Sequence, residues 1–258
     1  MTAGSQLRPL PASTFFAREI ILSSTTTSLQ GGSAGSFFKR GAGDRSPAVI
    51  ILPAIAGLNP YIDRMSDALA EQGYASVAMD YYARSGGAPD LSDRAKIMAA
   101  VASLSDRDVL ADIAANVEFL KSRPDIDGKR ISVMGFCVGG SFAILAASEI
   151  EGLACAIGFY GTIRYGQTTD RKPVSPLDAA QHLKCPLLAH YGEQDPLIPQ
   201  SDVEALRSTL KSHPAEIYSY PGAGHAFHED YRPEVYRPIA AQEAWRRSLA
   251  YLDWYRAK

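Results

Sequence analysis

The segment that decides the fold reads Arg130-Ile131-Ser132-Val133-Met134-Gly135-Phe136-Cys137-Val138-Gly139-Gly140 and leads into the apolar, alanine-rich stretch 141–147. The apolar residues at its start are typical of a strand and those at its end of a helix, so the residues between them predict a tight strand-to-helix turn. Small residues two before and two after Cys137 suit such a turn, because its backbone is strained and the chain crosses itself closely. We therefore expect Cys137 to project from the top of a sheet.

This position predicts that Cys137 is a nucleophile. The helix that begins behind it directs free backbone N–H groups and a positive dipole end at the sulfur, which favours the thiolate. With three cysteines and 21 glycines in 258 residues, a Gly-x-Cys-x-Gly pattern arises by chance about 0.02 times. The alternative is that Cys137 is a small buried hydrophobe, as free cysteines commonly are, but the flanking glycines would then serve no purpose.

The composition is that of a globular protein, with 46% hydrophobic and 21% charged residues. A net charge of −2 and the lack of Lys/Arg clusters argue against a nucleic-acid partner. Proline and charged residues interrupt positions 1–24, so neither a signal peptide nor a membrane span is predicted. Cys137, Cys155 and Cys185 are far apart, which indicates neither a disulfide framework nor a metal site. We expect a cytoplasmic protein with no membrane partner.

The rest of the chain alternates strands with helices. Continuous apolar runs, typical of strands buried on both faces of a parallel sheet, occur at 48–52, 74–79, 154–159 and 186–191, and a further strand is predicted at 216–220. Helical patterns occupy 59–72, 92–104, 106–123, 201–212 and 239–255. This alternation predicts an α/β fold with a doubly wound, mostly parallel sheet and helices on both faces.

The N-terminal region is predicted to add little to this sheet. Residues 1–17 are expected to form a loose arm before a single domain at 18–258. That domain is expected to open with strands at 18–23 and 36–39 and a turn at 41–44.

Two residues are predicted to complete a catalytic set with Cys137. Ligands of such sheets bind beyond the carboxyl ends of the strands. Asp195 directly follows the strand 186–191, and His225 lies in the glycine turn 222–227. The chain order nucleophile, acid, histidine is that of α/β hydrolases. His225 would take and return a proton, while Asp195 would fix the imidazole tautomer and stabilise its charged form.

An oxyanion formed at this site needs two donors. The N–H of Val138 at the helix start is predicted to be one, and the N–H of Ile55, in the loop after the strand ending at Leu52, the second. Aromatic residues after predicted strand ends could line the pocket, although aromatics there are as often core. They are Tyr81, Tyr82, Tyr160 and Phe227.

Other assignments of these residues remain open. An Asp before a proline is most often a turn residue, and Glu193 competes with Asp195. His228 is the rival of His225, but it lacks the tight glycine turn. Among the remaining candidates, His190 is predicted in the core or a pocket wall, His182 and His213 in solvent, and Cys155 and Cys185 as inert core thiols.

At these residues the chain resembles the dienelactone hydrolase family of α/β hydrolases, also called carboxymethylenebutenolidases. The resemblance runs from about Ser46 to the C-terminus. It implies the α/β-hydrolase fold, a Cys137, Asp195 and His225 triad, an oxyanion hole of Ile55 and Val138, and hydrolysis of an enol-lactone or related ester without a cofactor. The matching pieces are 55–59, 72–75, 80–84, 135–140, 159–161, 192–195 and 222–227.

Three positions of this chain bear on the comparison with this family, and two of them depart from it. The resemblance implies a glutamate that deprotonates the thiol, where this chain has Ala54. We therefore hypothesise that His225 and the helix dipole alone activate Cys137. The resemblance also implies two arginines that hold a substrate carboxylate; one aligns with Glu229, which reverses the charge, and the other with Arg94. Arg94 could equally be a solvated helix charge. These departures predict that dienelactone is a poor substrate and that a neutral or differently shaped lactone or ester is preferred.

Three functions fit the sequence. The first is a cysteine-dependent ester or lactone hydrolase acting on a small molecule. The second is a thioesterase or acyltransferase with the same triad, because the choice of acceptor depends on loop shape. The third is a non-catalytic binding or redox-sensing protein in which Cys137 is merely oxidised.

Overall fold

The computed structural model describes residues 37–39 and 45–256, so the predicted arm at 1–17, the strand at 18–23 and the turn at 41–44 lie outside the described residues. The described chain forms a seven-stranded sheet in the order β1-β3-β2-β4-β5-β6-β7. β1 pairs with β3 in antiparallel fashion and the other neighbours are parallel. The strands are β1 Phe37–Lys39, β2 Ser46–Leu52, β3 Ala75–Ala78, β4 Ile126–Phe136, β5 Ala156–Phe159, β6 Leu187–Gly192 and β7 Ala215–Tyr220.

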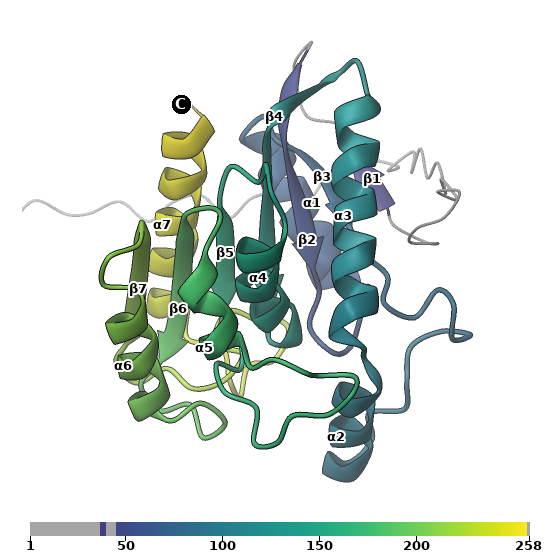
Figure 1. The fold of residues 1–258 in the computed structure, drawn as a ribbon. Helices are drawn as coiled ribbons and strands as arrows, with labels where there is room; N and C mark the ends of the chain where they lie inside the picture. The colour runs from purple at the N-terminus through teal and green to yellow at the C-terminus, as the bar shows by residue number, and fades with distance from the viewer. Residues whose placement is uncertain (1–36, 40–44, 257–258) are drawn as a thin grey trace, which may run out of the picture.

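Helices cover both faces of this sheet (Figure 1). α1 and α7 lie behind it in this view, whereas α3, α4 and α6 lie in front. Their bounds are α1 Pro60–Glu71, α2 Arg94–Ser103, α3 Asp106–Ser122, α4 Val138–Glu149, α5 Pro176–Ala179, α6 Gln200–Thr209 and α7 Pro238–Arg256, with a 3₁₀ turn at Ala180–His182. The predicted doubly wound, mostly parallel α/β fold is confirmed.

The centre of the core is the β4–α4 unit. Every residue of β2, which pairs with β4, is buried, and so is α4 from Val138 to Ser148. A helix that is apolar all round belongs inside the protein, where neighbours on every side restrict its movement. The backbone on which Cys137 depends is therefore anchored from both sides.

The local sequence explains where the loop after β2 ends and α1 begins. Asn59 caps α1, because its side chain accepts hydrogen bonds from the N–H groups of Tyr61 at 3.0 Å and Ile62 at 3.2 Å. Pro60 occupies the first helical position, where its missing N–H costs nothing. No helix in the described part of the chain combines the length and apolarity needed to cross a membrane.

Candidate active site

Cys137 alone separates β4 from α4. Its φ of 54° and ψ of −117° are strained values for a residue with a side chain. A Cβ atom at Gly135 would lie 1.9 Å from the carbonyl oxygen of Gly139, and one at Gly139 would lie 2.0 Å from that of Leu52. The close crossing of the chain that the sequence predicts is thus present, and only glycine fits at these two positions.

The structure brings Cys137, His225 and Asp195 together. His225 Nε2 lies 3.2 Å from Cys137 Sγ, and His225 Nδ1 lies 2.8 Å from Asp195 Oδ2. The other carboxylate oxygen of Asp195 accepts the N–H of Leu197 at 2.8 Å. The carboxylate is completely buried and the imidazole is 18% exposed. The three side chains follow the carboxyl ends of β4, β7 and β6, where ligands of parallel sheets bind.

The electrostatic surroundings of His225 favour the charged form of its imidazole. Burial works against the imidazolium, but hydrogen bonds to Asp195 and Cys137 and their negative charges outweigh it and raise the pKa of His225 to about 10. The carboxylate can hold the proton on the Nδ1 side while the Nε2 proton faces the sulfur. The geometry therefore suits an imidazolium beside the Cys137 sulfur near neutral pH.

The rival residues lie elsewhere. His228 Nδ1 lies 2.7 Å from the Tyr61 hydroxyl, and burial lowers the pKa of His228 to about 4. Glu193 is exposed. His190 is buried and held by Tyr220 and Ser248 at 2.9 and 3.0 Å, as expected for a core histidine.

The structure also shows how buried the other cysteines and histidines are. Cys155 and Cys185 are buried, and desolvation raises the pKa of each thiol to about 12, which agrees with inert core thiols. Cys137 is only partly buried. His182 is exposed as predicted, whereas His213 is half-buried, because the turn before β7 partly covers it.

Two tyrosines hold the loop that carries Ile55. The Tyr81 hydroxyl donates to the Pro53 carbonyl at 3.1 Å, and the Tyr82 hydroxyl donates to the Ile55 carbonyl at 2.7 Å. These bonds fix the peptide groups on either side of the one that carries the Ile55 N–H. Among the described residues, no hydrogen bond occupies the N–H of Ile55 or of Val138. Both donors are therefore available to an oxyanion.

The sequence suggested Tyr81 and Tyr82 as pocket-wall residues and did not predict these hydrogen bonds. Tyr82 is only 5% exposed, and its ring packs edge-on against that of Tyr81 at 6.2 Å between centroids. A position after a strand end indicates that a side chain is near the site. It does not reveal that the hydroxyl reaches back to a loop 27 or 28 residues earlier.

Tyr160 and Phe227 differ from the expected pocket wall, since both side chains are 0% exposed. The Tyr160 ring packs edge-on against the His225 imidazole, with 5.2 Å between centroids, and Phe227 packs against Tyr160 at 5.4 Å. The loop after β7 covers these large apolar surfaces. They support the imidazole instead of facing the open pocket.

Arg94 and Glu229, at the positions where the resemblance implies arginines, are placed very differently. Arg94 is exposed at the start of α2, and no contact given for the described residues joins it to Cys137 or His225. The Glu229 side chain is 4% exposed and is paired with Arg232 at 3.1 Å, while the Tyr231 hydroxyl donates to it at 3.0 Å. The sequence analysis did not single out Arg232. Its position three residues after Glu229 was the signal that could have predicted their ion pair.

A parallel sheet, a strained elbow after its central strand, and a sulfur–imidazole–carboxylate chain at the carboxyl ends of the strands define an α/β hydrolase. The model of the dienelactone hydrolase family matches residues 35–256. A solved structure called "Crystal Structure of Putative Dienelactone Hydrolase from Klebsiella pneumoniae subsp. pneumoniae MGH 78578" superposes with a TM-score of 0.79 and 33% identity, over 84% of this chain and 92% of that one.

Two relatives agree with this match. A Bradyrhizobium protein named "Probable 2-oxo-3-(5-oxofuran-2-ylidene)propanoate lactonase" is 42% identical over 213 residues, which are 82% of this chain and 85% of that protein. An Escherichia coli protein named "Putative carboxymethylenebutenolidase" is 37% identical over 215 residues, 82% of this chain and 78% of that protein. The chain belongs to the dienelactone hydrolase family, and it is a hydrolase of the lactone and carboxylic ester class.

Proposed function

We propose that this protein hydrolyses a neutral lactone or carboxylic ester through a covalent acyl-enzyme on Cys137, without a cofactor. One observation carries the proposal: an unbroken chain of contacts runs from Cys137 Sγ through the His225 imidazole to the buried Asp195 carboxylate, at 3.2 and 2.8 Å. Such a chain activates a nucleophile and supplies the proton that its leaving group needs.

The reaction follows from these positions. The Cys137 thiolate attacks the carbonyl carbon, and the carbonyl electron pair moves onto the oxygen, which accepts hydrogen bonds from the N–H groups of Ile55 and Val138. When this intermediate collapses, the C–O bond breaks and the leaving alkoxide takes the Nε2 proton of His225. The neutral imidazole then deprotonates a water molecule that attacks the thioester. Breaking the C–S bond returns the thiolate and releases the carboxylic acid.

The preference for a neutral substrate rests on the surroundings of Glu229. Arg232 is paired through Nη1 with Glu229 and through Nε with Glu234, both at 3.1 Å, so two carboxylates already hold this guanidinium. A substrate carboxylate would have to displace one of them. A neutral ester does not need to displace either carboxylate, which supports the preference for a neutral substrate that the sequence predicted.

The test compares wild type with Cys137→Ala on neutral aryl esters, lactones and thioesters. We expect kcat/KM to fall by at least about a thousandfold, because the nucleophile is removed. Cys185→Ala is the matched control and should stay within about threefold, because its thiol is a buried core group. Activity retained by the Cys137 variant would contradict the proposal.

Two further readouts separate the alternatives. Free acid should remain the main product when a small alcohol is added, whereas predominant acyl transfer to that alcohol would favour an acyltransferase. A folded wild-type protein that turns over no member of the panel would favour the redox-sensing alternative. In that case a thiol-alkylating reagent would modify Cys137, although the protein shows no measurable ester hydrolysis.

A further inference from the structure

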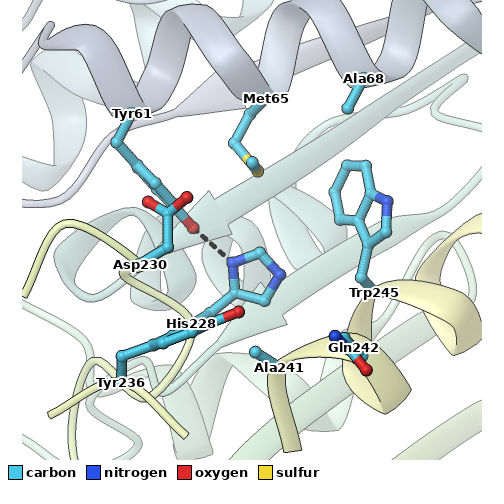
Figure 2. A pocket seen from close by; sticks show the side chains of 9 residues that line it. All are labelled: Tyr61, Met65, Ala68, His228, Asp230, Tyr236, Ala241, Gln242 and Trp245. Carbon is cyan, nitrogen blue, oxygen red and sulfur yellow. Dashed lines mark hydrogen bonds between the residues drawn. The ribbon is translucent and has the colours of Figure 1, made fainter. Parts of the chain in front are cut away.

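A second pocket lies between α1, α7 and the loop that follows His225 (Figure 2). Its volume is about 190 Å³. We call it the His228 pocket; the side chains that matter to its chemistry are Tyr61, Met65, Ala68, His228, Asp230 and Trp245. No triad residue and neither oxyanion donor is among the residues that line it. The pocket is therefore distinct from the candidate active site.

One polar atom on the wall of this pocket makes no hydrogen bond with the described residues. His228 is 7% exposed, and its Nδ1 is engaged by the Tyr61 hydroxyl at 2.7 Å. The other ring nitrogen, Nε2, has no hydrogen bond among the described residues. In Figure 2 it points into the space beside Trp245. This nitrogen is open to the pocket, where a ligand or water can be its hydrogen-bond partner.

One tautomer of the His228 imidazole presents a donor to the pocket. If Tyr61 donates its hydroxyl proton to Nδ1, the neutral ring carries its own proton on Nε2. Burial keeps His228 neutral at pH 7 by lowering its pKa to about 4. In that tautomer His228 offers its Nε2–H to the pocket.

The remaining walls favour an apolar, uncharged molecule. Met65, Ala68 and the Trp245 ring supply apolar surface, and the uncharged side chains of Tyr236 and Gln242 add polar groups. Asp230 is the one charged side chain among the described residues that line the pocket; it is exposed and pairs with Arg64. Its carboxylate would repel an anion. An apolar cavity of about 150 Å³ holds a benzene molecule, so this pocket has room for one ring with a small substituent.

We propose that the His228 pocket binds a neutral, monocyclic aromatic compound with one hydrogen-bond acceptor, such as an aryl ketone or a small aryl ester. The acceptor would take the Nε2 proton of His228, and the ring would pack against Met65 and Trp245. This proposal does not depend on hydrolysis by Cys137, because the pocket shares no lining residue with the triad.

Acetophenone is the probe, and the signal is the indole N–H resonance of Trp245 in a ¹H–¹⁵N correlation spectrum. The chain has two tryptophans, so Trp254→Phe assigns the resonance. We expect a saturable shift of the Trp245 signal with acetophenone. Ethylbenzene, which lacks the acceptor, should bind about three- to tenfold more weakly, the effect of one hydrogen bond. Benzoate, an anion, should bind more weakly still.

Variants locate the binding. Ala68→Leu places a larger side chain in the pocket and should weaken acetophenone binding about tenfold or more. Ala70→Leu, the same change on the same helix at a position that does not line the pocket, should leave it within about twofold. Cys137→Ala should bind acetophenone as wild type does. No saturable shift of Trp245, equal affinity for ethylbenzene, or an unchanged affinity in Ala68→Leu would each overturn the proposal.

Discussion

At the scale of single residues, we expect the charge on His225 to decide how Cys137 reacts. The hydrogen bonds and charges of Asp195 and Cys137 raise the pKa of His225 to about 10 against the effect of burial. A raised pKa means that the imidazolium persists at neutral pH and is lost as pH rises through about 10. Because Ala54 provides no carboxylate, no glutamate at that position can take part in activating the thiol.

Alkylation of Cys137 by iodoacetamide tests this activation. In wild type we expect the rate constant to change less than about twofold between pH 7 and 9. In His225→Ala it should rise more than about tenfold over the same range, as for an ordinary thiol that titrates near 8.5. His182→Ala, an exposed histidine elsewhere, is the control. A rate unaffected by His225→Ala would count against the role of the imidazole.

Tyr82 is predicted to act as a positioning residue. Tyr82→Phe removes the 2.7 Å bond to the Ile55 carbonyl and loosens the peptide next to the oxyanion donor. We expect kcat on a neutral aryl ester to fall about three- to tenfold with KM nearly unchanged, because the bond matters most when charge develops on the oxygen. Tyr218→Phe, which loses an exposed bond to Glu216, should show neither change. A rise in KM alone would instead indicate a substrate-binding wall.

The residues that sequence reasoning placed well are those whose roles follow from local backbone rules. Gly135 and Gly139 are required by the elbow, and His225 follows from its glycine turn. The partners of Tyr81 and Tyr82 could not be predicted, because they depend on how a loop far away in the sequence approaches these rings. The ion pair of Glu229 with Arg232 was missed for a similar reason, since only the folded loop shows that the Glu229 carboxylate is buried beside Arg232.

At the scale of elements, the β4–α4 turn is the least tolerant part of the fold. Gly135→Ala would place its Cβ 1.9 Å from a backbone oxygen, so either β4 or α4 must move. We expect a loss of at least about 3 kcal/mol in the free energy of unfolding, measured by urea denaturation. Gly166→Ala, where a Cβ meets nothing within 4 Å, should change it by less than about 0.5 kcal/mol. Similar midpoints for the two variants would contradict the crowding.

The long elements were predictable because their patterns are strong. Buried strands are continuous apolar runs, and α3 and α7 carry helical repeats over 17 and 19 residues. The four-residue helix α5 and the 3₁₀ turn after it were not predicted, since they are too short to show a period. The helix after Cys137 begins at Val138, earlier than its apolar stretch suggests, because the strained elbow needs a single residue.

At the scale of the whole molecule, the charges near the site should select the substrate. Glu229 and Glu234 both hold Arg232, and a dienelactone carboxylate would compete with them. We expect kcat/KM for dienelactone to be lower than that for a neutral aryl ester of similar size. Steady-state kinetics at two salt concentrations check this, because screening should reduce the difference. A specificity constant for dienelactone well above that of the neutral ester would refute the preference.

The elbow geometry affects how the nucleophile of such a protein can change during evolution. The unusual φ of Cys137 is imposed by the glycines on either side and by the Phe159 carbonyl that accepts its N–H at 3.0 Å, and none of these contacts involves the sulfur. The backbone would present an oxygen atom in the same place. Since one base change turns a cysteine codon into a serine codon, the scaffold lets the attacking atom be exchanged in a single mutational step while everything built around it stays.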